Sequence, residues 1–559
     1  MTRSVHSIVL LLALAFVPNH ALGADLSSLK RPVSVEITGI EASTDESGTS
    51  ISISLSGRPD YSIRSQISIS AIHIEIKNAA LSPNIPKLID VSDGRVVDIS
   101  ALEAGKGRSR ITIKTNPGMN YKVVSDTGPG SVINIYVEPP PALYKPETSS
   151  PRASWGTSLD LSGYLKNETA YRISDPEEFT KIRNTIYLAL TGTLSEHISY
   201  KASGRAFYDA VFGLTDNYPQ SVEDDQESEA DLRETYLDIS AGDWDARLGR
   251  QNIVWGEAVG LFFADVVNAK DLREFVLPDF DYIRIPQWAA DIEYTKDAIH
   301  LELVWIPVLD FNKLGGTGSE FPMAVPVPDG VAPAILDTRE PANGLENSEL
   351  GARASYLVNG WDLSLFHLYA WDKFPAMERE VLSPALYLFS PDHRRINISG
   401  LTFSKEINDA VLKGEFVYYK GKNFSVIDAG DDDGLVKKDY IDYLVGVDYT
   451  FFDKLDFNFQ FMQRVIFGFE DRIFREERVR SSVSVWLKTG FREDSIEPEL
   501  LVITGLDELD MLIRPSLSFK LFEGLQAKLG LDIFEGPVDG IFGQYRDSDR
   551  VYAEARYDF

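Results

Sequence analysis

The sequence predicts an all-β protein: a small periplasmic β-sandwich followed by a transmembrane antiparallel β-barrel of about eighteen strands. Three observations lead to this prediction. The chain opens with a secretory signal, many short segments alternate apolar and polar residues, and the connections over residues 157–559 are alternately short and long.

Residues 1–23 have the features of a signal peptide. Arg3 supplies a positive start, residues 8–17 are apolar, and Ala21 to Gly23 form a small-residue cleavage site. No later apolar run approaches the ~20 residues of a membrane-spanning helix. With 0 cysteines, the chain has no disulfide, no lipid-anchor thiol and no thiolate metal site.

Residues 33–138 form the first predicted domain, in which turn residues separate short alternating strands. Such a pattern is typical of a small β-sandwich. The expected strands lie at 33–37, 51–55, 67–71, 72–76, 111–114 and 132–136.

This domain resembles the AMIN domain, a periplasmic β module of amidases and secretins. The resemblance rests on the strand pattern, on Leu55 to Gly57 with Tyr61, and on the later Ile-x-Ile runs. It implies a domain that contacts peptidoglycan; the alternative is a β-sandwich that acts only as a spacer. Residues 139–156 are rich in proline and are interpreted as a semi-extended linker.

Residues 157–559 are predicted to form an outer-membrane β-barrel. Tight turns alternate with generally longer loops, which is the rhythm of bacterial outer-membrane barrels. The alternative is a sixteen-stranded barrel, because 497–503 alternates poorly and Pro515 interrupts the next strand. The expected strands are 157–170, 181–194, 197–208, 230–241, 243–254, 287–295, 298–307, 348–358, 360–371, 394–406, 409–420, 440–451, 454–466, 478–490, 496–504, 509–519, 524–534 and 549–559.

The last strand alternates and ends on an aromatic residue. Tyr557 and Phe559 fall on one face, and they resemble the signal that barrel assembly machinery recognises. With the signal peptide, this places the protein in the outer membrane of a Gram-negative bacterium, with its first domain in the periplasm. The barrel is expected to contact outer-membrane lipid and lipopolysaccharide.

Alternation also predicts which side chains face the barrel lumen, because successive residues of a strand point to opposite faces. The polar members of three strands are assigned to it: Asp456, Asn458, Gln460, Arg464, Gln526, Lys528, Asp532, Glu554 and Arg556.

One long predicted loop, residues 255–286, has its own apolar side and many charges. It is expected either to fold inward and constrict the pore or to form an ordered external loop, and residues 265–273 could form a short helix within it. The residues assigned to a constriction are Arg250, Trp255, Glu257, Asp265, Asn268, Asp271, Arg273 and Arg284.

The same segment resembles a family of proteobacterial outer-membrane proteins of unknown function. The matching features are Gly249 to Gln251, Trp255-Gly256, the spacing of Asp265, Asn268 and Asp271, and Arg284. The resemblance implies a porin-like channel and says little about its solute.

Charge and motifs exclude several classes of function. The 55 basic against 85 acidic residues give a net charge of -30, which argues against nucleic-acid binding and suggests a preference for cations. The acidic stretches 223–231 and 428–434 are interpreted as solvated loops, with divalent bridging to lipopolysaccharide as the alternative. Without any familiar catalytic motif, no enzymatic activity, catalytic residue, metal or cofactor is expected.

The sequence therefore favours an outer-membrane channel for a small hydrophilic or amphipathic solute, with a domain that contacts peptidoglycan. Two alternatives stay open. One is a structural tether between outer membrane and cell wall with a plugged barrel, and the other is an export port for a polymer or lipid.

Overall fold

The structure is a computed structural model of the whole chain, and it divides into two compact units, residues 1–147 and 148–559. It describes residues 35–138 except for gaps at 45–48, 58–59, 67–70, 78, 83, 87, 92–95, 104–107, 116–119 and 126–131. It also describes residues 159–559 except for 196, 257, 259–261, 297, 329, 409, 429, 453 and 493–494. The signal peptide at 1–23 and the linker at 139–156 lie outside the described residues.

The first unit consists of two five-stranded sheets around a single core. One sheet has the order β5 (Ala79–Leu81), β1 (Val35–Thr44), β2 (Thr49–Leu55), β10 (Val132–Glu138), β9 (Asn120–Ser125). The other has the order β3 (Asp60–Gln66), β4 (Ala71–Lys77), β8 (Arg108–Thr115), β7 (Val96–Glu103), β6 (Leu88–Asp90). The alternating isoleucines of both sheets meet in this core, among them Ile37, Ile53, Ile74, Ile111 and Ile135. The unit is a β-sandwich, as the period-two pattern predicts.

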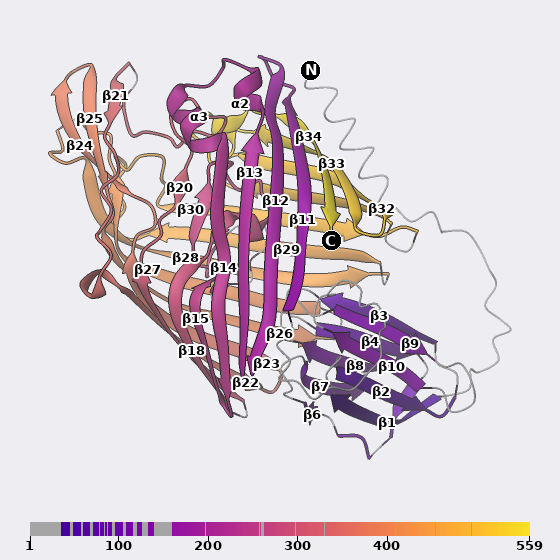
Figure 1. Cartoon of the computed structure of the whole chain (residues 1–559). Coiled ribbons are helices and arrows are strands. Elements are labelled where there is room, and N and C mark those ends of the chain that lie inside the picture. The colour runs from indigo at the N-terminus through magenta and orange to yellow at the C-terminus, as the bar shows by residue number, and fades with distance from the viewer. Residues whose placement is uncertain are drawn as a thin grey trace. The chain divides into compact units, whose positions relative to one another are not determined.

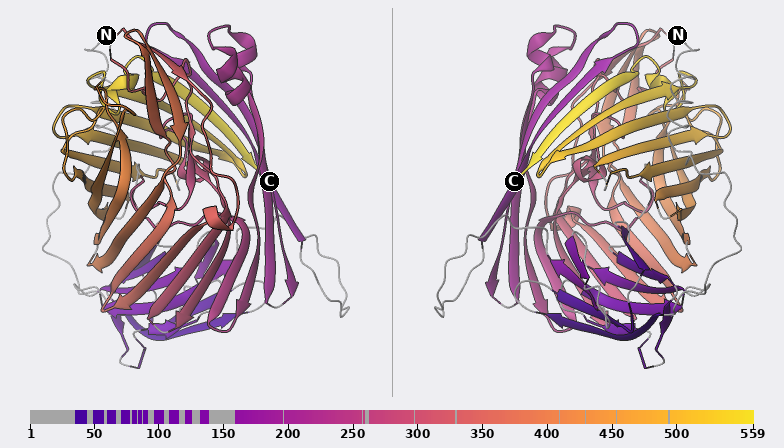
Figure 2. Two further views of the ribbon diagram at one scale, coloured as in Figure 1. Left: turned by 90° about the vertical axis from the view of Figure 1, so that its left-hand side faces the viewer. Right: turned by 90° about the vertical axis from the view of Figure 1, so that its right-hand side faces the viewer.

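The second unit is a closed antiparallel barrel of eighteen strands, which Figures 1 and 2 show as a ring of long arrows. In ring order the strands are β11 (Leu159–Arg172), β12 (Glu178–Ser195), β13 (Ile198–Asp209), β14 (Ser228–Ala241), β15 (Trp244–Gln251), β18 (Gln287–Lys296), β19 (Ile299–Val308), β22 (Glu349–Val358), β23 (Trp361–Trp371), β26 (Arg395–Ile407), β27 (Ala410–Ser425), β28 (Leu435–Phe451), β29 (Leu455–Ile466), β30 (Val479–Thr489), β31 (Ile496–Gly505), β32 (Met511–Phe522), β33 (Leu525–Glu535) and β34 (Arg550–Asp558). The predicted fold class and strand count are confirmed.

The sixteen-stranded alternative is wrong, since β31 and β32 pair along their length despite the weak alternation. Pro515 lies opposite Leu500 of β31. On its other side, the β32–β33 ladder skips from Ile513 to Ser516, so the proline falls where no strand hydrogen bond is needed.

The barrel closes between its first and last strands. Gly163 and Phe559 exchange two backbone hydrogen bonds of 2.9 Å, and β11 pairs with β34 from Tyr164 to Arg172. Closure leaves no unpaired strand edge, which is the condition for a sheet to cross a lipid bilayer.

The outer face of the barrel is apolar. Large side chains stay exposed at alternate strand positions, among them Leu161, Leu165, Leu188, Leu303, Leu365 and Leu529. Aromatic pairs lie near the strand ends, for example Trp244 with Tyr294 and Tyr171 with Phe179. This is the surface that an outer-membrane barrel presents to lipid. No helix among the described residues is long and apolar enough to cross a membrane.

Short turns and long loops lie at opposite ends of the barrel. At the long-loop end, the structure has two short helices, α2 (Val211–Leu214) and α3 (Gln220–Gln226). The same end has a three-stranded sheet of β21 (Ala332–Ile335), β25 (Leu386–Asp392) and β24 (Ala376–Ser383).

Candidate functional site: the segment inside the barrel

The segment of residues 252–286, named the insert here, interrupts what would otherwise be a hairpin between β15 and β18. Gln251 and Gln287 stand opposite each other in the ladder, so the chain leaves and rejoins the barrel wall at one place. Gly249 precedes the exit with φ 136°, a backbone conformation that favours glycine.

The insert lies inside the barrel, because its contacts reach strands all around the ring. On one side, the backbone N–H of Ala264 donates to Glu415 of β27 at 2.8 Å. Across the lumen, Arg514 of β32 donates to the carbonyl of Leu277 at 2.8 Å. Arg556 of β34 donates to the Tyr282 hydroxyl at 3.2 Å. A segment outside the barrel could not contact all three strands.

The insert packs apolar side chains against two stretches of the inner wall. Trp255, Ala264, Val266 and Val267 join lumen-facing residues of β19, β23, β26 and β27 in one cluster. Leu277, with Phe263, Phe275 and Val276 packed beside it, joins a second cluster on β28, β29, β31, β32 and β33. The apolar inner wall at these places is thus covered by the insert, as burial of apolar surface favours.

Trp255 is the largest apolar anchor. Its side chain is 2% exposed, its ring centroid lies 5.2 Å from that of Phe366, and its Nε1 donates to Glu302 of β19 at 2.8 Å. Gly351 of β22 makes room for it, since a Cβ there would stand 2.7 Å from the indole. A larger residue at 351 would therefore displace the ring.

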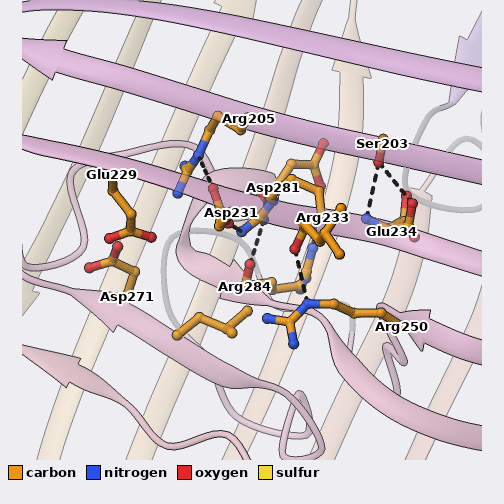
Figure 3. A network of polar contacts seen from close by, with 12 residues as sticks. Ser203, Arg205, Glu229, Asp231, Arg233, Glu234, Arg250, Asp271, Asp281 and Arg284 are labelled. Atoms are coloured by element: carbon orange, nitrogen blue, oxygen red, sulfur yellow. Dashed lines mark hydrogen bonds and ion pairs between the residues drawn. The ribbon is translucent and has the colours of Figure 1, made fainter.

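Charged residues anchor the side of the insert that faces β12 to β14, as Figure 3 shows in part. Arg233 of β14 donates to the carbonyls of Asp281 and Arg284 at 2.8 and 2.6 Å. Arg273 pairs with Asp271 and with Glu229 of β14, both at 2.7 Å. These contacts fix the backbone of the insert against the wall.

The predicted constriction residues are thus found in and beside the insert. Asp265 pairs with Arg284 at 2.7 Å, and Asn268 is fully buried with hydrogen bonds to both backbone groups of Ile253. Arg250 pairs with Asp310 at 3.2 Å. Glu257 lies outside the described residues.

The expectation of a short helix at 265–273 is wrong. Residues 269–272 form a strand, β16 (Ala269–Leu272), which pairs with β17 (Arg284–Ile285) and with β20 (Lys313–Leu314). These pairings come from distant chain segments and outweigh the local preference for helix. The helix of the insert is the later single turn α4 (Phe280–Ile283).

A second long connection, residues 309–348, contacts both the insert and the wall, and no pattern in the sequence indicates this. The backbone N–H of Lys270 in the insert donates to Asn312 of this connection at 2.8 Å. Lys313 pairs with Glu229 at 2.7 Å, and Glu320 pairs with Arg550 of β34 at 3.1 Å. Glu274 of the insert pairs with Lys181 and Arg183 of β12. Pairs between residues this far apart in the chain cannot be found from spacing.

Electrostatics keep the Glu274 anchor charged. Burial by itself would raise the pKa of Glu274, but the charges of Arg183 and Lys181 outweigh it and hold the pKa well below its ordinary value. Burial likewise opposes ionisation of Asp271, and Arg273 reverses this and lowers its pKa.

The structure places the predicted lumen residues on the inner face of their strands. Asn458, Gln460 and Asp532 are almost fully buried, at 2%, 0% and 0% exposed. The others interact along the same face: Arg464 with Asp442, Asp456 with Thr450, Glu554 with Lys166, and Arg556 with Asp558. Gln526 and Lys528 share the inner face of β33 with Asp532, while Tyr557 and Phe559 fall on the outer face.

The two acidic loop stretches have protein partners. Asp431 pairs with Arg472, and the Arg379 guanidinium donates to the carbonyls of Val426 and Asp428 at 2.9 and 2.6 Å. Glu229 pairs with Arg273 and Lys313, as above. Among the described residues, no group of three or more His, Asp or Glu side chains could hold a metal ion.

Unfilled space remains on one side of the insert. Two small cavities, of about 50 and 30 Å³, lie between the insert and the inner wall. Both are lined by Lys166, Glu168, Glu274 and Pro278, so the two cavities are neighbours.

Comparison with solved structures finds barrels of outer-membrane proteins at low identity. OccAB1 of Acinetobacter baumannii is 8% identical with a TM-score of 0.44, over 72% of this chain and 96% of that one. OccK8 (OprE) of Pseudomonas aeruginosa is 10% identical with a TM-score of 0.42, over 72% and 97%. A loop L8 deletion mutant of OmpT, an outer membrane protein of Vibrio cholerae, is 10% identical with a TM-score of 0.37, over 72% and 99%.

Comparison with curated proteins finds no significant match. The profile of one family, described as a protein of unknown function (DUF1302), matches residues 185–472, just over half of the chain. This range includes the insert and the strands on both sides of it. The chain therefore belongs to the DUF1302 family.

Proposed function

We propose that the protein is an outer-membrane channel for small hydrophilic or amphipathic solutes, and that the insert constricts its lumen. The observation that supports this most is the pair of neighbouring cavities beside the insert, inside a closed barrel and lined by charged side chains. A barrel that served only as an anchor would have no need of such a lining, whereas polar walls lower the cost of moving a hydrated solute.

The test is the conductance of single channels in planar bilayers, for the native chain and for a variant without the insert. Since Gln251 and Gln287 face each other, a short turn can replace residues 252–286 and complete the hairpin. We expect small steps for the native protein and larger steps for the variant.

A matched control shortens a different part of the same end of the barrel. Ala376 and Asp392 face each other across the β24–β25 hairpin, so a turn can replace residues 377–391. This change leaves the insert in place, and we expect native step sizes. Conductance steps of equal size in all three proteins would contradict constriction by the insert. If none of the three conducts, the result would contradict a channel and favour a tether.

We further propose that the N-terminal β-sandwich contacts peptidoglycan. Its sheets carry polar outward positions between the buried isoleucines, such as Ser52 and Asn134, whose side chains hydrogen-bond at 2.7 Å. Retention of the full chain on purified peptidoglycan, compared with a chain lacking residues 24–147, tests this. Equal retention of both would contradict it.

A further inference from the structure

A solute that passes beside the insert on the side of β11 to β13 would meet the two cavities described above. Apolar clusters join the insert to the wall at β19, β23, β26 and β27 and at positions on β28, β29 and β31 to β33. The two cavities lie against β11 to β13 and, beyond the apolar positions of β32 and β33, against the charged inner faces of β32 to β34. A solute in these cavities is therefore in contact with these walls.

Most charges along this path already have a partner in the wall or the insert. Glu168 and Glu554 pair with Lys166 at 3.2 and 3.4 Å. Asp532 pairs with Arg514 at 2.8 Å and with Arg550 at 2.9 Å. A solute could engage these groups only by breaking an existing pair, which is costly where the groups are buried.

Two charged side chains are exceptions, and both line the same cavity. Lys528 belongs to the wall strand β33, and Asp279 belongs to the insert just before α4. Within the part of the chain that the structure describes, neither side chain makes an ion pair within 4.0 Å or a hydrogen bond. Asp279 is nonetheless among the charges that act on the Lys528 ammonium.

We propose that Lys528 and Asp279 form a binding site for a small zwitterionic solute, with its carboxylate at Lys528 and its ammonium at Asp279. The inference rests on the proposed channel function and names the solute class of that channel. An unpaired cation and an unpaired anion that line the same cavity offer two charge-assisted contacts to a solute that carries both charges. A singly charged ion gains one contact and meets repulsion from the other group, and a neutral solute gains neither.

Swelling of liposomes that contain the full-length protein tests this with two isomers of equal size. Alanine is a zwitterion and lactamide is its neutral isomer, so their uptake ratio isolates charge from size. We expect native protein to admit alanine faster than lactamide. Lys528→Gln or Asp279→Asn should each lower this ratio by about threefold to tenfold, with lactamide uptake unchanged.

Lys413→Gln is the matched control. Lys413 is the fourth residue of β27, as Lys528 is of β33, and both follow a short turn at the same end of the barrel. Lys413 pairs with Asp448 at 3.0 Å and lines neither cavity, so its substitution should leave the ratio at the native value.

Three outcomes would overturn the inference. Equal uptake of the two isomers by native protein would contradict the site, as would a ratio that Lys528→Gln and Asp279→Asn do not lower. An equal loss in Lys413→Gln would show that any lumenal lysine has this effect. If neither isomer enters native liposomes, the channel itself is refuted, and the site with it.

Discussion

Replacing Trp255 by alanine should release the insert from the inner wall while the barrel stays intact. The indole is 2% exposed between the insert and the wall, and its Nε1 holds the carboxylate of Glu302. The substitution removes the ring and leaves that carboxylate without its donor.

The magnitude follows from these contacts. Removing a fully buried aromatic ring costs about 3–5 kcal/mol. Since each 1.36 kcal/mol is a factor of ten, the ratio of docked to undocked insert should fall by about two to four orders of magnitude. The loss of the hydrogen bond to Glu302 adds to this, so the ring alone gives a lower bound.

Single-channel recording measures the effect as time spent in a wide state. We expect small conductance steps for the native protein and frequent large conductance steps for Trp255→Ala. Trp305→Ala is the control, because Trp305 lies on β19 as Glu302 does but is 37% exposed, at an outward-facing position.

The reasoning would be refuted if Trp255→Ala kept native step sizes while the shift of its electrophoretic mobility on heating showed a folded barrel. It would also be refuted if Trp305→Ala opened the channel equally. Either result would mean that the docking of the indole does not set the width of the lumen.

Three further predictions follow from other contacts. Gly351→Val should reproduce the large conductance steps of Trp255→Ala, because the valine side chain would occupy the space of the indole. Conductance steps of native size would contradict this. Glu274→Gln should increase the size of the conductance steps at neutral pH. The conductance steps of the native protein should stay constant from pH 8 to 5. The depressed pKa of Glu274 means that its stabilising charge is present above the ordinary value of 4.5 and is lost only as pH falls through the lower folded value. Asp549→Asn should raise the melting temperature most above pH 6, since burial raises the pKa of Asp549 from 3.8 to about 6. Its ionisation penalty is absent below 3.8, grows between the two values and is complete above 6, so a gain that did not grow with pH would contradict this.

The strands could be predicted because their information is local. Alternation within Leu455 to Phe461 or Leu525 to Ile533 places apolar side chains toward lipid wherever the strand sits in the ring. The turns between neighbouring strands are local too. The hairpin of β31 and β32 is also indicated by the sequence. Pro515 leaves it ambiguous there, and the position of Pro515 in the strand pairing resolves the ambiguity.

The interior of the barrel could not be predicted in the same way. Trp255 and its charged neighbours marked the insert as a folded segment, but its partners come from strands more than a hundred residues away, such as Glu415 and Arg514. The strand β16 forms only because Lys313 and Leu314 are brought beside it. Such pairings depend on how the ring closes, and no spacing in the sequence records that.

The most direct test of the channel account is the accessibility of single cysteines in this cysteine-free chain. Thr185 of β12 lines the first cavity, while Val417 of β27 is fully buried beneath the insert. With a charged thiol reagent, Thr185→Cys should be modified and its conductance should fall, and Val417→Cys should stay unmodified with native conductance. Modification and block at Val417→Cys, with none at Thr185→Cys, would contradict a passage that runs beside a docked insert.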